Sequence, residues 1–133
     1  MAKERTIARA RLAPAAIRDV REIRRWSENK FGKPAAKRYE ALLLQALRDI
    51  EAEPERPGSK ERPDVMIAGA RTYHLAFSRG RVGGEKVHAP RHVVLYRHRT
   101  DGVLEVARIL HDARDLARHL PGAYRRISQT SAT

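Results

Sequence analysis

The chain has 133 residues, no cysteine and a formal charge of +12, from 28 Lys and Arg against 16 Asp and Glu. This length suits one domain with its own core, and the lack of cysteine excludes a disulfide framework, a thiolate metal site and a cysteine nucleophile. No apolar targeting segment opens the sequence, and no apolar run approaches the roughly 20 residues that cross a bilayer. We therefore expect a soluble, cytoplasmic protein that contacts no membrane.

The excess of cations predicts a positive field that attracts nucleic acid, anionic lipid or an acidic protein segment, and charge alone does not choose among them. Nucleotide composition bias is an alternative source of the charge, because most of the cations are arginine, alanine is abundant and asparagine occurs only at Asn29. The charge informs association and solubility rather than fold.

The first predicted element is a short strand over Thr6 to Leu12, where Ala8, Ala10 and Leu12 alternate with Ile7, Arg9 and Arg11. Two helices follow. Pro14 suits the first turn of one helix, which Phe31 and Gly32 end, and Pro34 opens the next. Apolar residues with helical spacing mark the buried side of both helices: Ile17, Val20, Ile23, Trp26, then Ala36, Tyr39, Leu43, Leu47 and Ile50. The short link predicts an antiparallel helical hairpin.

Prolines at 54, 57 and 63 predict a loop, after which residues 65–67 and 71–79 read as extended. Residues 80–90 form a long, glycine-containing loop, so the segments that flank it should pair as a long-looped hairpin. The runs 91–99 and 103–110 flank Asp101-Gly102, which is a strong signal for a tight β-hairpin turn. A short C-terminal helix should follow, and residues 128–133 should be a disordered tail.

The resulting order is β-α-α-β-β-β. Because the helices precede most of the strands, we predict an α+β fold in which a helical hairpin covers one face of a small, largely antiparallel sheet.

In the C-terminal third, Tyr96-Arg97 in a predicted strand is followed by a tight turn and by a strand that ends in Arg-Ile-Leu-His before Ala113-Arg-Asp-Leu116. This arrangement resembles the ParE branch of the RelE/ParE family of bacterial toxins. Weaker matches are Leu12-Ala-Pro-Ala-Ala16, Trp26, Phe31-Gly32 and Ala36-Lys-Arg-Tyr39. The loop over residues 80–90 is longer than in many relatives.

The resemblance implies a single toxin domain over residues 1–127, the toxin half of a toxin–antitoxin pair, held inactive by a cognate ParD-like antitoxin. ParE-like toxins are understood to poison DNA gyrase, whereas RelE-like toxins cut mRNA on the ribosome. A relative that has lost toxicity and only binds nucleic acid or a partner is a third alternative.

Ribonuclease chemistry needs a base for the 2′-OH, an acid for the leaving oxygen and cations for the phosphorane. His111, Arg71, Arg97 and Tyr96 are the candidates for such a set. His111 can equally hydrogen-bond the turn that follows it, and the run around it matches the ParE pattern. We therefore expect no catalytic residues and no cofactor.

Inhibition by binding needs only a rigid cationic and aromatic surface. The candidate target-binding residues are Arg71, Arg97, Arg108, His111 and Arg114, and each could instead pair with a nearby carboxylate. For an acidic, amphipathic antitoxin segment the candidate contacts are Tyr39, Leu42 and Leu44, with core burial as the alternative. His88 and His92 lack further ligands at metal-binding spacing, so no metal site is expected.

Overall fold

The computed structural model describes residues 5–7, 9–111 and 116–126. Its helices are α1 (Pro14–Phe31), α2 (Lys33–Ala52) and α3 (Leu116–His119), with 3-10 helices η1 (Leu75–Arg81) and η3 (Gly122–Tyr124). Its strands are β1 (Arg5–Ile7), β2 (Ala10–Leu12), β3 (Lys60–Glu61), β4 (Arg71–His74), β5 (Val93–His98) and β6 (Leu104–Leu110). The predicted tail over 128–133 lies outside the described residues.

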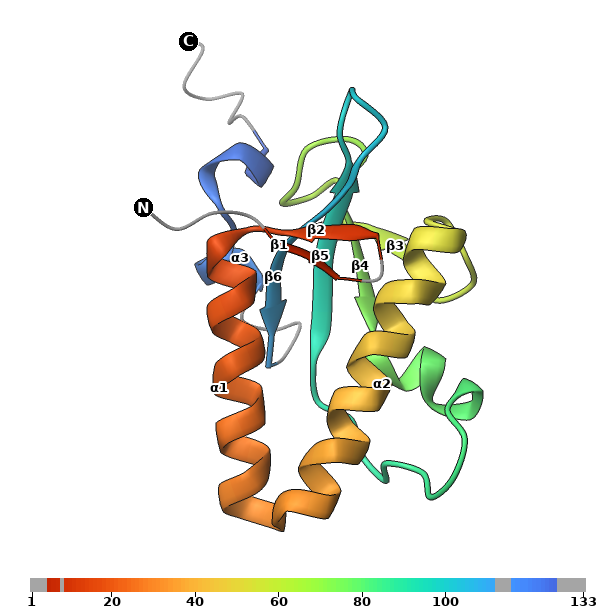
Figure 1. The fold of residues 1–133 in the computed structure, drawn as a ribbon. Helices are drawn as coiled ribbons and strands as arrows, with labels where there is room; N and C mark the ends of the chain where they lie inside the picture. The colour runs from red at the N-terminus through yellow and green to blue at the C-terminus, as the bar shows by residue number, and fades with distance from the viewer. Residues whose placement is uncertain (1–4, 8, 112–115, 127–133) are drawn as a thin grey trace, which may run out of the picture.

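One sheet runs in the order β1-β2-β6-β5-β4-β3, and every neighbouring pair is antiparallel except β2 with β6. The helices α1 and α2 form a hairpin along the sheet (Figure 1). This arrangement confirms the predicted α+β class and the predicted helical hairpin on a largely antiparallel sheet. In the described residues, no helix is both long and apolar enough for a membrane span.

The helical hairpin begins and ends where the sequence predicts. Proline occupies the first turn of both helices, where a missing N–H costs no hydrogen bond. Gly32 separates the helices with φ of 86°, a left-handed value that side-chain-bearing residues adopt only at a cost, and its N–H donates to the Glu28 carbonyl.

Apolar side chains cover both faces of the sheet. The hairpin side holds the larger core, which includes Leu12, Leu42, Leu47, Ile50, Tyr73, Tyr96 and Val106. The opposite side holds a second core that the C-terminal segment closes: Met66, Ala70, Leu95, Ala107, Leu110, Leu116, Leu120 and Tyr124. A β-bulge at Ala107 resets the alternation of β6, since Leu95 pairs with Arg108 whereas Tyr96 pairs with Val106.

Three sequence predictions of extended structure need correction. The single strand predicted over residues 6–12 is two short antiparallel strands, because Arg9 adopts φ of 68° and reverses the chain between them. The strand predicted over residues 71–79 stops at His74, whose Nδ1 accepts the Ala76 N–H and begins η1. In the 65–67 segment, only Met66 forms a β-bridge, to Arg125. Strand β3, at Lys60–Glu61, lies in the predicted loop.

The two predicted hairpins are present. Strands β4 and β5 pair across the long connection 75–92, and β5 and β6 pair across a turn in which Gly102 has φ of 83°. Asp101 supports this turn by accepting the Val103 N–H at 3.1 Å.

A buried carboxylate attaches η1 to α2. Asp49 accepts hydrogen bonds from Ser78 at 2.6 Å and from Arg81 at 2.9 Å.

Candidate functional site

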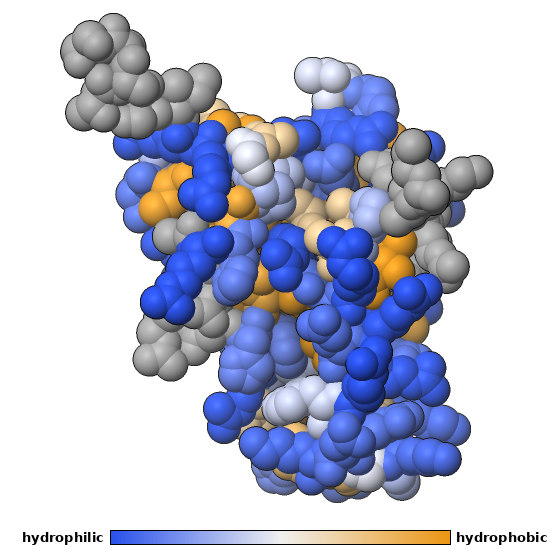
Figure 2. Space-filling view, turned by 90° about the vertical axis from the view of Figure 1, so that its left-hand side faces the viewer, coloured by the Kyte–Doolittle hydropathy of each residue, from blue (hydrophilic) through white to orange (hydrophobic). Residues whose placement is uncertain are grey.

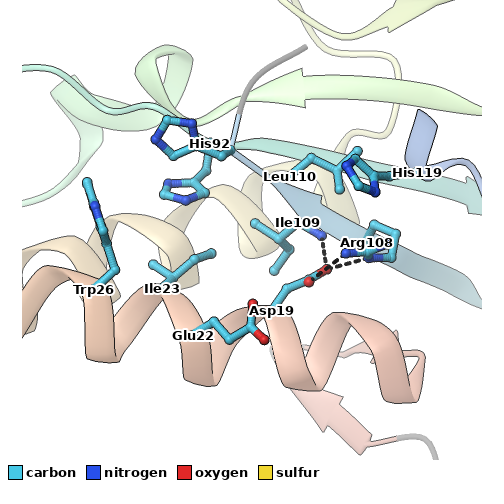
Figure 3. Close-up of a pocket in the computed structure, with 10 residues that line it drawn as sticks. Asp19, Glu22, Ile23, Trp26, His92, Arg108, Ile109, Leu110 and His119 are labelled. Atoms are coloured by element: carbon cyan, nitrogen blue, oxygen red, sulfur yellow. Dashed lines mark hydrogen bonds and ion pairs between the residues drawn. The ribbon is translucent and has the colours of Figure 1, made fainter. Parts of the chain in front are cut away.

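A buried carboxylate joins α1 to the edge of β6. The parallel pairing of β2 with β6 ends at Val106, whose carbonyl accepts the Ala13 N–H. Six residues beyond Ala13, Asp19 on α1 extends this contact with β6. Its carboxylate accepts from Arg108 Nε at 2.8 Å, Arg108 Nη2 at 2.9 Å and the Ile109 N–H at 2.8 Å (Figure 3). Asp19 therefore replaces a missing strand partner and neutralises Arg108, whose pKa it raises by hydrogen bonding.

An aromatic cluster lies farther along α1, around Trp26. The Trp26 ring makes edge contacts with Phe31, Tyr39, His92 and His111, with centroid separations of 5.7, 5.9, 5.5 and 6.0 Å. These rings come from both helices, from the segment before β5 and from the end of β6. The cluster thus connects the helical hairpin to one end of the sheet.

His92 is the buried polar member of this cluster, at 4% exposure. Its Nδ1 lies 2.6 Å from the Tyr39 hydroxyl, whose oxygen accepts the Arg91 N–H at 2.9 Å. The Tyr39 hydroxyl therefore links the His92 ring to the backbone of the segment that precedes β5. Burial, together with smaller effects of nearby His111 and His74, lowers the pKa of His92 to about 4. His92 is therefore neutral at physiological pH.

Two hollows meet at Trp26. The first, of about 270 Å³, is bordered by Asp19, Glu22, Ile23, Trp26, His92, Arg108, Ile109, Leu110, His111 and His119 (Figure 3). The second, which we call the hairpin groove, has about 490 Å³ and runs between the α1–α2 junction and the 85–91 loop. Its lining combines Trp26, Phe31, Ala35, Tyr39, Val87 and Ala89 with the cations Arg38, Lys86 and Arg91. Phe31 is 60% exposed, which is unusual for a large apolar side chain.

The predicted target-binding arginines do not form one patch. Arg71 is half-buried and donates to Ser59 Oγ at 2.6 Å, while Arg97 pairs with Glu105 at 3.1 Å and stacks on Tyr124 at 4.6 Å. Arg108 is held by Asp19, as described above. Arg114 lies outside the described residues.

The predicted nuclease residues are also apart. Arg71 pairs in register with Tyr96, whereas His111 follows Leu110, the partner of Val93. Tyr96 is three residue steps from Val93, which is about 10 Å along the strand. Tyr96 is fully buried and burial raises the pKa of its hydroxyl, which hydrogen-bonds Ser59 and the Pro54 carbonyl. His111 is exposed and directly follows β6, beside the end of β5 that is farther from Tyr96.

The predicted antitoxin contacts have different exposures. Tyr39 and Leu42 belong to the core, at 5% and 1% exposure, and Leu44 is half-buried. Tyr39 still borders the hairpin groove. In the described part of the chain, no group of three or more His, Cys, Asp or Glu side chains is arranged to hold a metal ion.

Sequence reasoning missed Asp19, Phe31 as an exposed ring, and the pairing of His92 with Tyr39. The partners of Asp19 and of His92 are 89 and 53 residues away, so no local spacing signals either contact. A polar residue at position 19, between Ala16 and Ile23 on the buried side of a predicted helix, is the one available hint for Asp19.

The fold and these surfaces define a small basic α+β protein with an apolar, cation-rimmed groove and no assembled acid–base set among the described residues. A family model described as the ParE toxin of the type II toxin-antitoxin system, parDE, matches residues 10–116, so the chain belongs to this toxin family. A search of curated proteins gives no match.

Proposed function

We propose that this toxin inhibits DNA gyrase by binding it, and that a ParD-like antitoxin encoded with it neutralises the inhibition. Membership of the ParE family gives the toxin class and implies an antitoxin partner. The observation that favours binding over cleavage is the separation of the candidate nuclease residues, since Tyr96 is buried within the sheet and His111 lies at its end. Inhibition by binding needs complementary surfaces and no proton-transfer group.

We place the gyrase contact at the end of the sheet that carries His111, beside the hollow bordered by Glu22 and His119. Arg108 borders this hollow, with 25% of its side-chain surface accessible. Arg71 and Arg97, with 18% and 27% accessible, lie near Tyr96, toward the other end of β5, and are candidates for a separate contact. Arg114 stays a candidate from its sequence position. Ser59, Glu105 and Asp19 orient Arg71, Arg97 and Arg108, respectively, before any target is bound.

The hairpin groove is our proposed antitoxin site. Its apolar floor suits the hydrophobic face of an amphipathic segment, and Arg38, Lys86 and Arg91 at its rim suit acidic side chains on the other face. One carboxylate, Glu85, lies within the rim, 3.5 Å from Arg38, and would exchange that partner on binding. Tyr39 contributes to the groove directly, whereas Leu42 supports it from the core.

The test is gyrase supercoiling in the presence of the purified toxin, scored for lost supercoiling and for trapped cleaved DNA. We expect dose-dependent inhibition that the antitoxin relieves. Codon-specific mRNA cuts on ribosomes, with gyrase unaffected, would establish the ribonuclease alternative instead. Folded toxin that leaves gyrase, mRNA and cell growth unaffected would identify a non-toxic relative.

A further inference from the structure

The outer face of α1 carries an arginine stripe formed by Arg18, Arg21 and Arg25. Their spacings of three and four residues place them on one side of a helix with 3.6 residues per turn. All three side chains are exposed, and the opposite side of α1 buries Ala16, Ile23 and Ser27. The stripe therefore faces directly away from the core.

The structure pairs none of the three arginines of the stripe with a described carboxylate. No carboxylate of the described residues lies within 4.0 Å of the three guanidinium groups, whereas neighbouring Arg24 pairs with both Glu28 and Glu40. Glu22 points instead into the hollow beside Asp19 (Figure 3). Like charges three or four residues apart destabilise a helix. Within the described residues, no ion pair offsets the repulsion among these three arginines.

We propose that the arginine stripe binds the phosphate backbone of duplex DNA without sequence preference. Guanidinium groups match phosphate oxygens bidentately, and seven residues of helix extend the stripe over about 10 Å, enough to follow several phosphates of one strand. The net charge of +12 draws polyanions to the molecule, and the stripe gives them a contact surface. This inference does not depend on gyrase being the toxin's target.

DNA fits this surface better than an acidic peptide does. Peptide interfaces depend on buried aromatic and aliphatic anchors, and the residues between and beside the three arginines on the outer face of α1 are polar, ending at Asn29. The apolar anchors belong to the hairpin groove, which α1 borders through Trp26 and Phe31. Hydrophilic side chains dominate the α1 side of the molecule (Figure 2).

The experiment measures fluorescence anisotropy of a labelled 30-base-pair duplex of arbitrary sequence with the purified chain, between 50 and 200 mM KCl. The stripe variant carries R18Q, R21Q and R25Q. A charge-matched control carries K33Q, K37Q and K60Q, which removes three exposed cations outside α1. Circular dichroism and thermal unfolding check that both variants fold.

The slope of log K against log salt is negative, and we expect its magnitude to be about 2.7 smaller in the stripe variant, because each lost phosphate contact removes about 0.9. The control should change the slope by less than about 1. Equal losses in the two variants would show that only total charge matters and would overturn the proposal, as would failure of the unsubstituted chain to bind. Loss of binding to labelled poly-glutamate, with duplex binding unchanged, would assign the stripe to an acidic protein and also overturn it.

Discussion

Replacing Asp19 by alanine should be among the most destabilising single changes in this chain. The carboxylate is 7% exposed and accepts three hydrogen bonds, two from Arg108 and one from the Ile109 N–H. Breaking a buried ion pair costs about 3 to 5 kcal/mol, and Arg108, a quarter of whose side chain is exposed, recovers part of this through water. The unpaired Ile109 N–H adds about 1 kcal/mol.

We therefore expect Asp19→Ala to lower the free energy of unfolding by about 3 to 4 kcal/mol. Asp19→Asn keeps an acceptor for Ile109 and should cost about 2 kcal/mol. The matched control is Arg24→Ala on the same helix, which removes only exposed ion pairs to Glu28 and Glu40 and should cost less than about 0.5 kcal/mol.

Urea unfolding followed by circular dichroism measures all three variants, and an unchanged m-value would show that the midpoint shift reports stability. The reasoning is refuted if Asp19→Ala costs less than about 1 kcal/mol or no more than Arg24→Ala.

Three further outcomes follow from named contacts. The pKa of His92 is lowered to about 4 in the folded protein from about 6.5 in the unfolded chain, so the unfolded state binds an extra proton between these pH values. The free energy of unfolding should therefore fall by up to about 3 kcal/mol as the pH drops from 6.5 to 4. Unfolding of His92→Gln measured across that range should lack this pH-dependent loss of stability. Gly58 has φ of 98°, and a Cβ there would lie 2.5 Å from the Phe77 ring, so Gly58→Ala should lower the free energy of unfolding in urea by more than about 2 kcal/mol. Gly69→Ala is the control, because Gly69 also has positive φ but has open space around it, and should cost about 1 kcal/mol. Phe31→Ser should weaken antitoxin binding at least tenfold in calorimetry, which is on the order of 1.4 kcal/mol. The control is Phe77→Ser, at the other exposed phenylalanine, which should not weaken binding. Equal effects of the two substitutions would show that the antitoxin does not bind in the hairpin groove.

Local chemistry made much of the fold predictable from the sequence. Proline at the first turns of α1 and α2 and Gly32 between them specify the hairpin, and Asp101-Gly102 specifies the β5–β6 turn. These signals depend on residues close together in the sequence, so they can be recognised without knowledge of the tertiary structure.

The failures have equally specific causes. The alternation of Tyr73, Leu75 and Phe77 mimics a strand, but the His74 side chain starts a 3-10 helix that leaves Phe77 exposed. Arg9 reverses the chain in a left-handed conformation that favours glycine or asparagine, so no turn signal marks it.

The candidate site was less predictable than the fold, because its contacts are long-range. Arg108 was recognised as a cation, but its neutralisation by Asp19 depends on where β2 stops pairing with β6. The prediction of a cationic surface likewise could not anticipate that Arg71 and Arg97 are held by Ser59 and Glu105. The arginine stripe depends only on helical periodicity, but only the three-dimensional structure shows that no carboxylate of the described residues lies within 4.0 Å of it.

The most direct test of the account is a titration of the folded toxin against a fixed amount of gyrase in the supercoiling assay. Inhibition by binding predicts loss of supercoiling that rises with the toxin-to-gyrase ratio, saturates near equivalence and is reversed by an equimolar antitoxin. Full supercoiling at a large excess of folded toxin would contradict the account.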